Sequence, residues 1–76
     1  MSARPVKHSV TLRGHRTSIS LEDEFWHELR RFAQEMDMPI NALVAQIDAE
    51  RGVEAGLASA IRVYVLRALK ERLSAS

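Results

Sequence analysis

The sequence predicts a mostly helical domain that opens with a short β-ribbon and continues with three helices. Residues 16–21 alternate polar side chains at even positions with apolar or β-branched ones at odd positions, the pattern of a strand with one buried face. Residues 22–36, 40–51 and 57–73 instead repeat apolar side chains every three to four positions, as amphipathic helices do. No segment after residue 21 alternates again. The strand therefore needs a partner, either upstream in the chain or in a second copy of it.

The length of the chain, 76 residues, corresponds to one domain. Residues 1–7 contain Pro5 and show no periodicity, so they are predicted to form a flexible arm ahead of a single domain at residues 8–73. A domain of this size buries only about 60% of the surface that its unfolded chain exposes. Oligomerisation is therefore an expected source of additional stability.

The segment before the strand is a second candidate strand with a different parity. Val10 and Leu12 occupy even positions, whereas Ile19 and Leu21 occupy odd ones, so one straight strand cannot bury all four. A two-residue hairpin turn at residues 13–14 would bring both pairs onto one face. A bulge at Gly14 would reset the parity equally well, and Arg is a poor first residue for the turn. Both alternatives remain open from the sequence.

The first helix is marked by acids in its first turn, at residues 22–24, where the helix dipole favours negative charge. Ser20 and Asp23 approximate a capping box. The helix then carries one apolar stripe, which consists of Phe25, Trp26, Leu29, Phe32, Ala33 and Met36. Because the aromatic residues share a single face, we expect them to pack in the core rather than to stack on bases.

The second helix is predicted to start with Pro39 at its first position and to end with a left-handed cap at Gly52. Its apolar stripe consists of Ile40, Leu43, Val44 and Ile47. Met38 is a weak cap, which leaves the backbone N–H groups of Ile40 and Asn41 free either to bind an anion or to be solvated. The third helix has a broader apolar surface than one neighbour can cover, which indicates a subunit interface or a second protein partner.

Charge is distributed unevenly along the chain, although the net charge is only +1. Residues 1–20 carry four basic side chains and no acid, residues 21–56 carry nine acids against three basic side chains, and residues 57–76 are basic again. Arg16 lies within the strand alternation, on the polar face with Ser18 and Ser20. A basic, hydroxyl-rich strand face is suited to a polyanion.

Several function classes are disfavoured by what the sequence lacks. It has no cysteine, and its three histidines, His8, His15 and His27, do not have the spacing that places two metal ligands on one helix face. No glycine-rich phosphate loop is present, and so small a chain has little room for a catalytic pocket. We therefore expect no metal, no cofactor and no enzyme activity. Without a membrane-length apolar run, we expect a cytoplasmic protein.

Three segments in order, RTSISLEDEFWHELRRFA, INALVAQIDAERG and SAIRVYVLRAL, resemble the ribbon-helix-helix domain of the Arc and MetJ repressor type. The closest resemblance is to a group of short bacterial ribbon-helix-helix proteins, and it covers about residues 8–70. The usual domain ends with its second helix, so the third helix is an addition that either enlarges the dimer core or recruits another protein.

The resemblance implies an intertwined homodimer in which residues 16–21 of two chains pair antiparallel about a two-fold axis. Arg16, Ser18 and Ser20 match the base-reading positions in the major groove of double-stranded DNA. Ile40 and Asn41 match the family's phosphate clamp, with Arg13 and Lys7 as further phosphate contacts. The expected dimer core comprises Ile19, Leu21, Trp26, Leu29, Leu43 and Ile47.

Two functions follow from this interpretation. The first is a sequence-specific DNA-binding protein that regulates transcription. The alternative is a dimeric protein-interaction module, antitoxin-like or structural, with weak or no DNA binding, which the acidic middle segment and the broad third helix favour. Salt dependence distinguishes them, because a protein that contacts several phosphates loses affinity steeply as salt rises.

Overall fold

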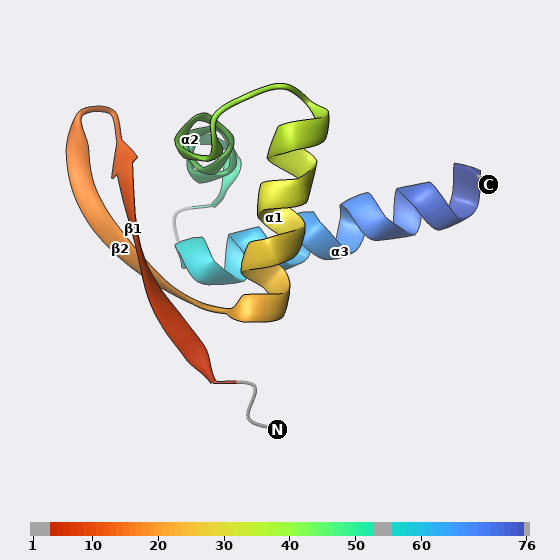
Figure 1. Cartoon of the computed structure of the whole chain (residues 1–76), viewed down its shortest axis with the longest axis horizontal. Helices are drawn as coiled ribbons and strands as arrows, with labels where there is room; N and C mark the ends of the chain where they lie inside the picture. Colours follow the sequence, from red (N-terminus) through yellow and green to blue (C-terminus); the bar gives the residue numbers. More distant parts are fainter. Residues whose placement is uncertain (1–3, 53–55, 76) are drawn as a thin grey trace.

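The computed structural model describes residues 4–52 and 56–75. Its elements in chain order are β1 (Pro5–Leu12), β2 (His15–Glu22), α1 (Asp23–Glu35), α2 (Ile40–Glu50) and α3 (Leu57–Ala75). The two strands form a ribbon along one side of the molecule, and the helices pack against it (Figure 1). The predicted fold class, a mostly helical domain with an N-terminal ribbon, is confirmed.

The ribbon is a hairpin within one chain. β1 and β2 are antiparallel, with Leu12 opposite His15 and Val10 opposite Thr17. The connecting residues Arg13 and Gly14 have φ angles of 53° and 82°, as a two-residue primed turn requires. Of the two alternatives, the structure therefore has the hairpin and not the bulge. The partner of β2 lies upstream in the same chain.

The ribbon has one apolar and one polar face, as the hairpin alternative requires. Val10, Ile19 and Leu21 are buried, and Leu12 packs against the same cluster. The opposite face is exposed along both strands. The helices cover only the apolar face, which leaves the polar side chains of the ribbon accessible.

The expectation that residues 1–7 form a flexible arm is wrong from Pro5 onward. Val6 and Lys7 belong to β1 and lie opposite Leu21 and Ser20. Val6 continues the even-numbered pattern of Val10, and proline is tolerated as the first residue of a strand because no ladder hydrogen bond is needed there. Residues 1–3 of the predicted arm lie outside the described residues.

The cap predicted for α1 is also wrong. Glu22 is the N-cap, with extended backbone angles and no side-chain cap hydrogen bond. β2 stays extended up to that residue, so Ser20 remains on the ribbon and cannot cap the helix. Glu22 instead accepts hydrogen bonds from Nε and Nη2 of Arg62 in α3, at 2.8 and 3.0 Å.

α2 begins at Ile40, with Pro39 as its N-cap rather than as its first helical residue. The left-handed cap predicted at Gly52 is wrong, because the helix ends at Glu50 and its C-cap, Arg51, has extended backbone angles. The N–H of Arg51 donates to the carbonyl of Ile47 at 3.1 Å, and its Nε donates to Asp48 Oδ1 at 2.6 Å. These bonds close the last turn without a residue of positive φ.

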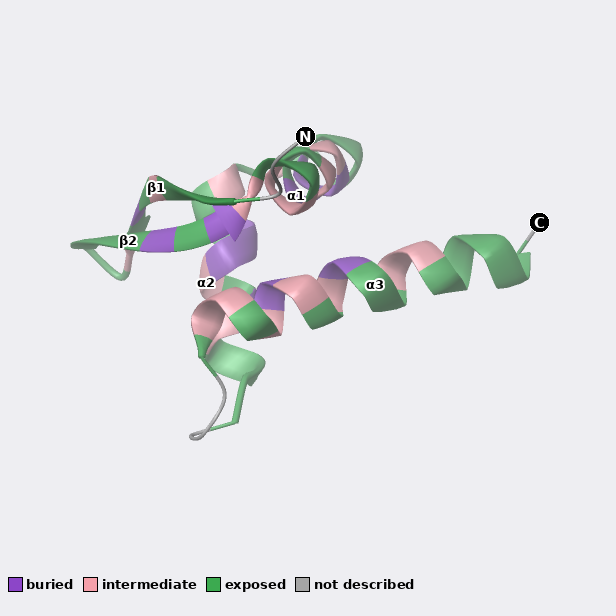
Figure 2. Ribbon diagram, turned by 90° about the horizontal axis from the view of Figure 1, so that it is seen from below, coloured by how far each residue is buried: buried purple, intermediate pink, exposed green. Residues whose placement is uncertain are grey.

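The core is assembled from both strands and all three helices of a single chain. The largest fully buried side chains are those of Leu21, Leu29, Leu43, Val44, Ile61 and Val65. α3 supplies the last two from its first half, and its C-terminal end is exposed (Figure 2). The first half of α3 therefore covers one side of the core, beneath α1 in the view of Figure 2. In the described part of the chain, no helix is long and apolar enough to span a membrane.

Candidate functional site

The exposed face of the hairpin consists of three cross-strand pairs of polar side chains. Across the ribbon, Lys7 lies opposite Ser20, Ser9 opposite Ser18, and Thr11 opposite Arg16. We call these six exposed residues the polar ribbon face. They comprise two cations and four hydroxyls, so hydrogen-bond donors and positive charge lie together without an acid among them. Such a face can bind a negatively charged, oxygen-rich surface.

Arg16, Ser18 and Ser20, which the sequence predicted to read bases, occupy alternate positions on β2. Their side chains lie on the same face of one strand. Within the described residues, none of the three forms a side-chain hydrogen bond or an ion pair. Their donors and acceptors are therefore accessible to a ligand.

The two edges of the ribbon differ. The pair that closes a two-residue hairpin turn exchanges hydrogen bonds, and hydrogen-bonded pairs then alternate along the ladder. The backbone groups of Arg16, Ser18 and Ser20 consequently point away from β1. The corresponding outer N–H of Thr11 on β1 donates to Asn41 Oδ1 at 3.2 Å. α2 thus covers part of the β1 edge, and in the half of the ribbon near the turn β2 is the strand farther from α2 (Figure 1).

The start of α2 lies beside the ribbon through this contact. Pro39, the N-cap of α2, makes no side-chain cap hydrogen bond. Its carbonyl accepts hydrogen bonds from the N–H groups of Ala42 and Leu43, so the N–H groups of Ile40 and Asn41 precede the first hydrogen bond within the helix. Ile40 is half-buried and Asn41 is exposed. The structure gives Asn41 a second role that the sequence did not reveal, because its side-chain oxygen holds α2 against β1.

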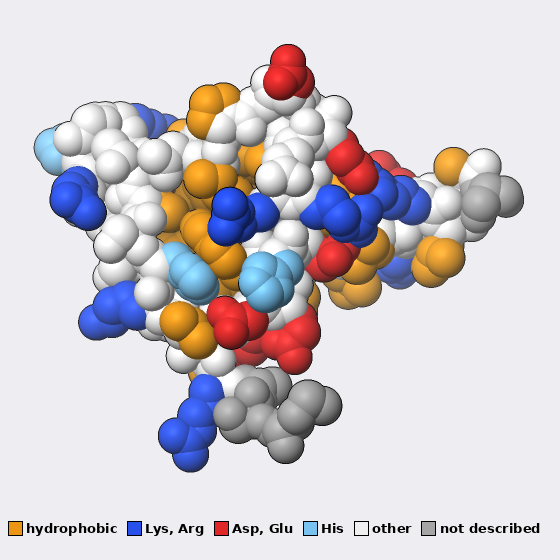
Figure 3. Space-filling view, in the orientation of Figure 1, with side chains coloured by type: hydrophobic (Ala, Val, Ile, Leu, Met, Phe, Trp, Pro, Cys, Tyr) orange, Lys and Arg blue, Asp and Glu red, His pale blue; other side chains and the backbone are white. Residues whose placement is uncertain are grey.

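The remaining predicted phosphate contacts, Arg13 and Lys7, are both exposed. Arg13 lies in the turn at the tip of the hairpin, and Lys7 lies near the other end of β1. On the face shown in Figure 3, the charged side chains over the ribbon are basic, whereas acidic and basic side chains are mixed over the helices. The ribbon is therefore the basic side of this view.

Glu22, the acid at the end of β2, is paired with an arginine. The hydrogen bonds from Arg62 hold the pKa of Glu22 below its ordinary value. The carboxylate at the end of β2 is therefore engaged with α3 and repels a polyanion less than a free carboxylate would. A similar contact, from Arg31 to Glu28, lowers the pKa of Glu28 on α1.

The residues predicted for a dimer core lie largely in the core of the single chain. Ile19, Leu21, Leu29, Leu43 and Ile47 are all buried there. Trp26 is only half-buried, and its ring stacks on His8 of β1 with centroids 4.0 Å apart.

Sequence reasoning missed His8. It shares the even parity of Val10 in β1, which would have placed it on the apolar face. Its buried Nε2 has no hydrogen-bond partner and lies 3.9 Å from Asp23 Oδ1.

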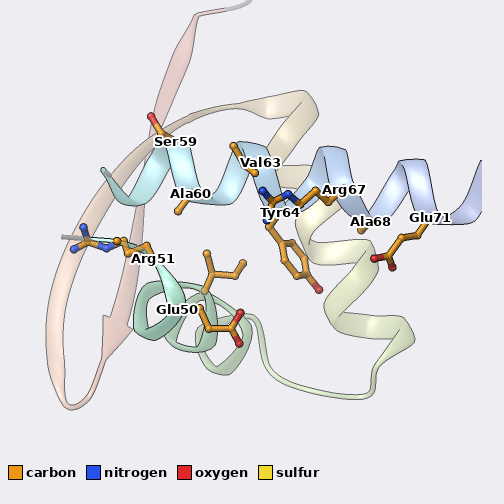
Figure 4. Close-up of a pocket in the computed structure, with 11 residues that line it drawn as sticks. Glu50, Arg51, Ser59, Ala60, Val63, Tyr64, Arg67, Ala68 and Glu71 are labelled. Atoms are coloured by element: carbon orange, nitrogen blue, oxygen red, sulfur yellow. The ribbon is translucent and has the colours of Figure 1, made fainter. Parts of the chain in front are cut away.

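A groove of about 530 Å³ lies between the end of α2 and α3, away from the ribbon (Figure 4). Its lining includes Tyr64, the acids Glu50 and Glu71, and the bases Arg51 and Arg67. Burial raises the pKa of Tyr64, and the two carboxylates add to this effect. Acidic and basic side chains balance here, so the groove does not have the charge of a polyanion site. Among the described residues, no cluster could hold a metal ion.

The comparisons with known proteins agree with this geometry. A family model described as "Ribbon-helix-helix domain" matches residues 5–69. No curated protein and no solved structure matches the chain. The family match includes both strands of the hairpin and most of α3.

Proposed function

The chain belongs to the ribbon-helix-helix family, whose members generally bind DNA in transcription regulators or antitoxins, and on this premise we propose that it is a sequence-specific DNA-binding protein. It acts in the cytoplasm as a homodimer that regulates transcription. Its reading element is a two-fold β-ribbon that enters the major groove of double-stranded DNA. The observation that carries the proposal is the exposed row of Arg16, Ser18 and Ser20 beside an open strand edge.

The open edge of β2 supports the dimer. Its outward backbone groups, at residues 16, 18 and 20, can pair with the same groups of a second copy. An antiparallel arrangement with Ser18 at the two-fold axis satisfies all three positions in both chains. Because the pairing is symmetric, it forms a closed dimer rather than an open chain of subunits.

The chemistry of the face supports DNA as the ligand. Arg16 can donate two hydrogen bonds to O6 and N7 of guanine, a contact that discriminates against a wrong base by about 1–3 kcal/mol. Ser18 and Ser20 are smaller and accept a wider range of base edges. The N–H groups of Ile40 and Asn41, with Arg13 and Lys7, bind the phosphates that hold the ribbon in register.

Substitution of Arg16 by alanine tests this assignment. We expect the variant to lose about tenfold or more in affinity for its selected duplex, and to lose its preference at one base position, because the guanidinium contact is absent. Its thermal stability is expected to stay unchanged, since Arg16 is exposed. The measurement is a binding titration with selected and scrambled duplexes.

Arg30→Ala is the matched control, since Arg30 is an exposed arginine of α1 and is not part of the ribbon. It is expected to bind both duplexes as the unaltered protein does. If Arg16→Ala and Arg30→Ala behave alike, the assignment of the reading face is wrong.

The second candidate is a dimeric protein-interaction module, antitoxin-like or part of an assembly. It is favoured by α3, where the apolar side chains of Val63 and Leu66 are 45% and 56% exposed and can contact a second protein. Duplex binding that falls steeply between low and moderate salt supports the DNA-binding function. Binding that is negligible at every salt concentration supports the interaction module.

A further inference from the structure

β1 provides the ribbon with a second row of exposed polar side chains, Lys7, Ser9 and Thr11. We propose that in the dimer β1 is the outer strand of a four-stranded sheet, and that these side chains bind phosphates of the DNA backbone while β2 alone reads bases. This inference rests on the proposed DNA-binding function. It assigns Ser9 and Thr11 as binding residues and divides the labour between the two strands.

The strand order follows from the two edges of the hairpin. The outer N–H of Thr11 is bonded to Asn41, and α2 packs along β1, so this edge is partly occupied. The outer backbone groups of Arg16, Ser18 and Ser20 have no partner among the described residues. A second copy therefore adds at β2. The sheet then has two β2 strands at its centre and one β1 strand at each side.

The width of this sheet prevents all four strands from entering the groove. Neighbouring strands lie about 4.8 Å apart, so the two β1 strands are separated by about 14 Å before their side chains are counted. The major groove is about 12 Å wide. The two central strands fit within it, and each β1 strand lies over a wall of the groove, where the phosphates are.

The residues of β1 are suited to that position. Lys7 supplies a flexible point charge, and the hydroxyls of Ser9 and Thr11 can donate to phosphate oxygens. The hydrogen bond between Thr11 and Asn41 also places the start of α2 beside β1. Hydroxyls, ammonium group and helix N-terminus therefore face the same wall of the groove. All are groups that bind phosphate without reading sequence.

The test uses Lys7→Ala, Ser9→Ala and Thr11→Val in the full chain, each first checked for an unchanged melting temperature. Each is expected to weaken binding to selected and scrambled duplexes by the same factor. For Lys7→Ala, the slope of log affinity against log salt is expected to become shallower by about 1.8, since a dimer loses two phosphate contacts. Lys70→Ala, which removes the same charge from exposed α3, is the control and is expected to leave the slope unchanged.

Sequence selection with the same variants completes the test. The selected sequence is expected to stay the same for all three β1 variants and to change for Arg16→Ala. A changed base preference for Ser9→Ala or Thr11→Val places β1 inside the groove and overturns this inference, while DNA reading stands. Unaltered binding by all three variants also overturns it. Absence of salt-dependent duplex binding by the unsubstituted protein overturns the proposed function itself.

Discussion

Arg13 occupies the turn of the hairpin with a φ angle of 53°. This left-handed conformation is unfavourable for most side chains, on the order of 1 kcal/mol, whereas asparagine tolerates it. Arg13→Asn is therefore expected to raise the melting temperature by a few degrees. The same change removes a cation from the tip of the ribbon, so duplex affinity and its salt dependence are expected to fall together. Thermal unfolding and a salt titration check the two effects, and a variant that is both less stable and equally tight in binding contradicts them.

Glu22 links the end of the ribbon to α3 through Arg62. Because its pKa is lowered in the folded protein, the contribution of this carboxylate to stability is present above the ordinary value of 4.5 and is lost as the pH falls through the lower folded value. As the pH falls from about 5 to about 3, Glu22→Gln is expected to lose less stability than the unaltered protein, because the variant lacks the carboxylate that takes up a proton there. The pKa of Glu28 is also lowered, so the melting temperature of the variant is still expected to fall somewhat with pH. Melting temperature against pH is the measurement, and identical curves refute the role of Glu22.

At the scale of elements, parity predicted the ribbon correctly but could not choose its turn. Val10 lies at an even position and Ile19 at an odd one, so the parity of the buried positions has to change between the two segments. A hairpin or a bulge changes it equally well. The turn was hard to predict because arginine rarely occupies the first position of a primed turn. The cap at Ser20 was misassigned because the strand continues to Glu22, a limit that depends on pairing with Pro5. Such long-range pairing cannot be derived from local pattern.

The sequence alone could not decide whether the partner of residues 16–21 lies upstream in the chain or in a second copy. The missing partner of β2 proved to be β1, and the buried residues expected at a dimer interface are covered by α3 in the same chain. The polar face was predictable, since Arg16, Ser18 and Ser20 follow from the alternation alone. The bond from Thr11 to Asn41 was not, because it joins residues 30 positions apart.

α3 is predicted to stabilise the fold mainly through its first half, which holds its two fully buried side chains. Ile61 is fully buried among the other elements, whereas Leu73 is 77% exposed. Ile61→Ala is expected to lower the free energy of unfolding by about 2–5 kcal/mol, because it leaves a cavity in the core. Leu73→Ala is the matched control and is expected to change it by less than about 0.5 kcal/mol. Denaturant unfolding measures both, and equal losses contradict the view that Ile61 contributes more to the packing of α3 than Leu73 does.

For the molecule as a whole, a core closed within one chain separates folding from dimerisation. Ser18→Pro removes an N–H that points away from β1, so the hairpin keeps its own ladder while the open edge loses its central donor. We expect this variant to be a folded monomer whose melting temperature does not depend on protein concentration. The unaltered protein, for which we propose a dimer, is expected to melt at a higher temperature as concentration rises. Sedimentation and thermal unfolding at several concentrations provide the measurement.

Ser9→Pro is the matched control, because Ser9 lies directly opposite Ser18 and its N–H also points away from the hairpin, but on the side where α2 packs. This variant is expected to remain dimeric, since the proposed pairing between copies uses β2 and not β1. If Ser9→Pro dissociates and Ser18→Pro does not, the copies meet at the other edge of the ribbon. If both remain dimeric, the strands do not form the interface, and the two-fold ribbon proposed to read DNA does not exist.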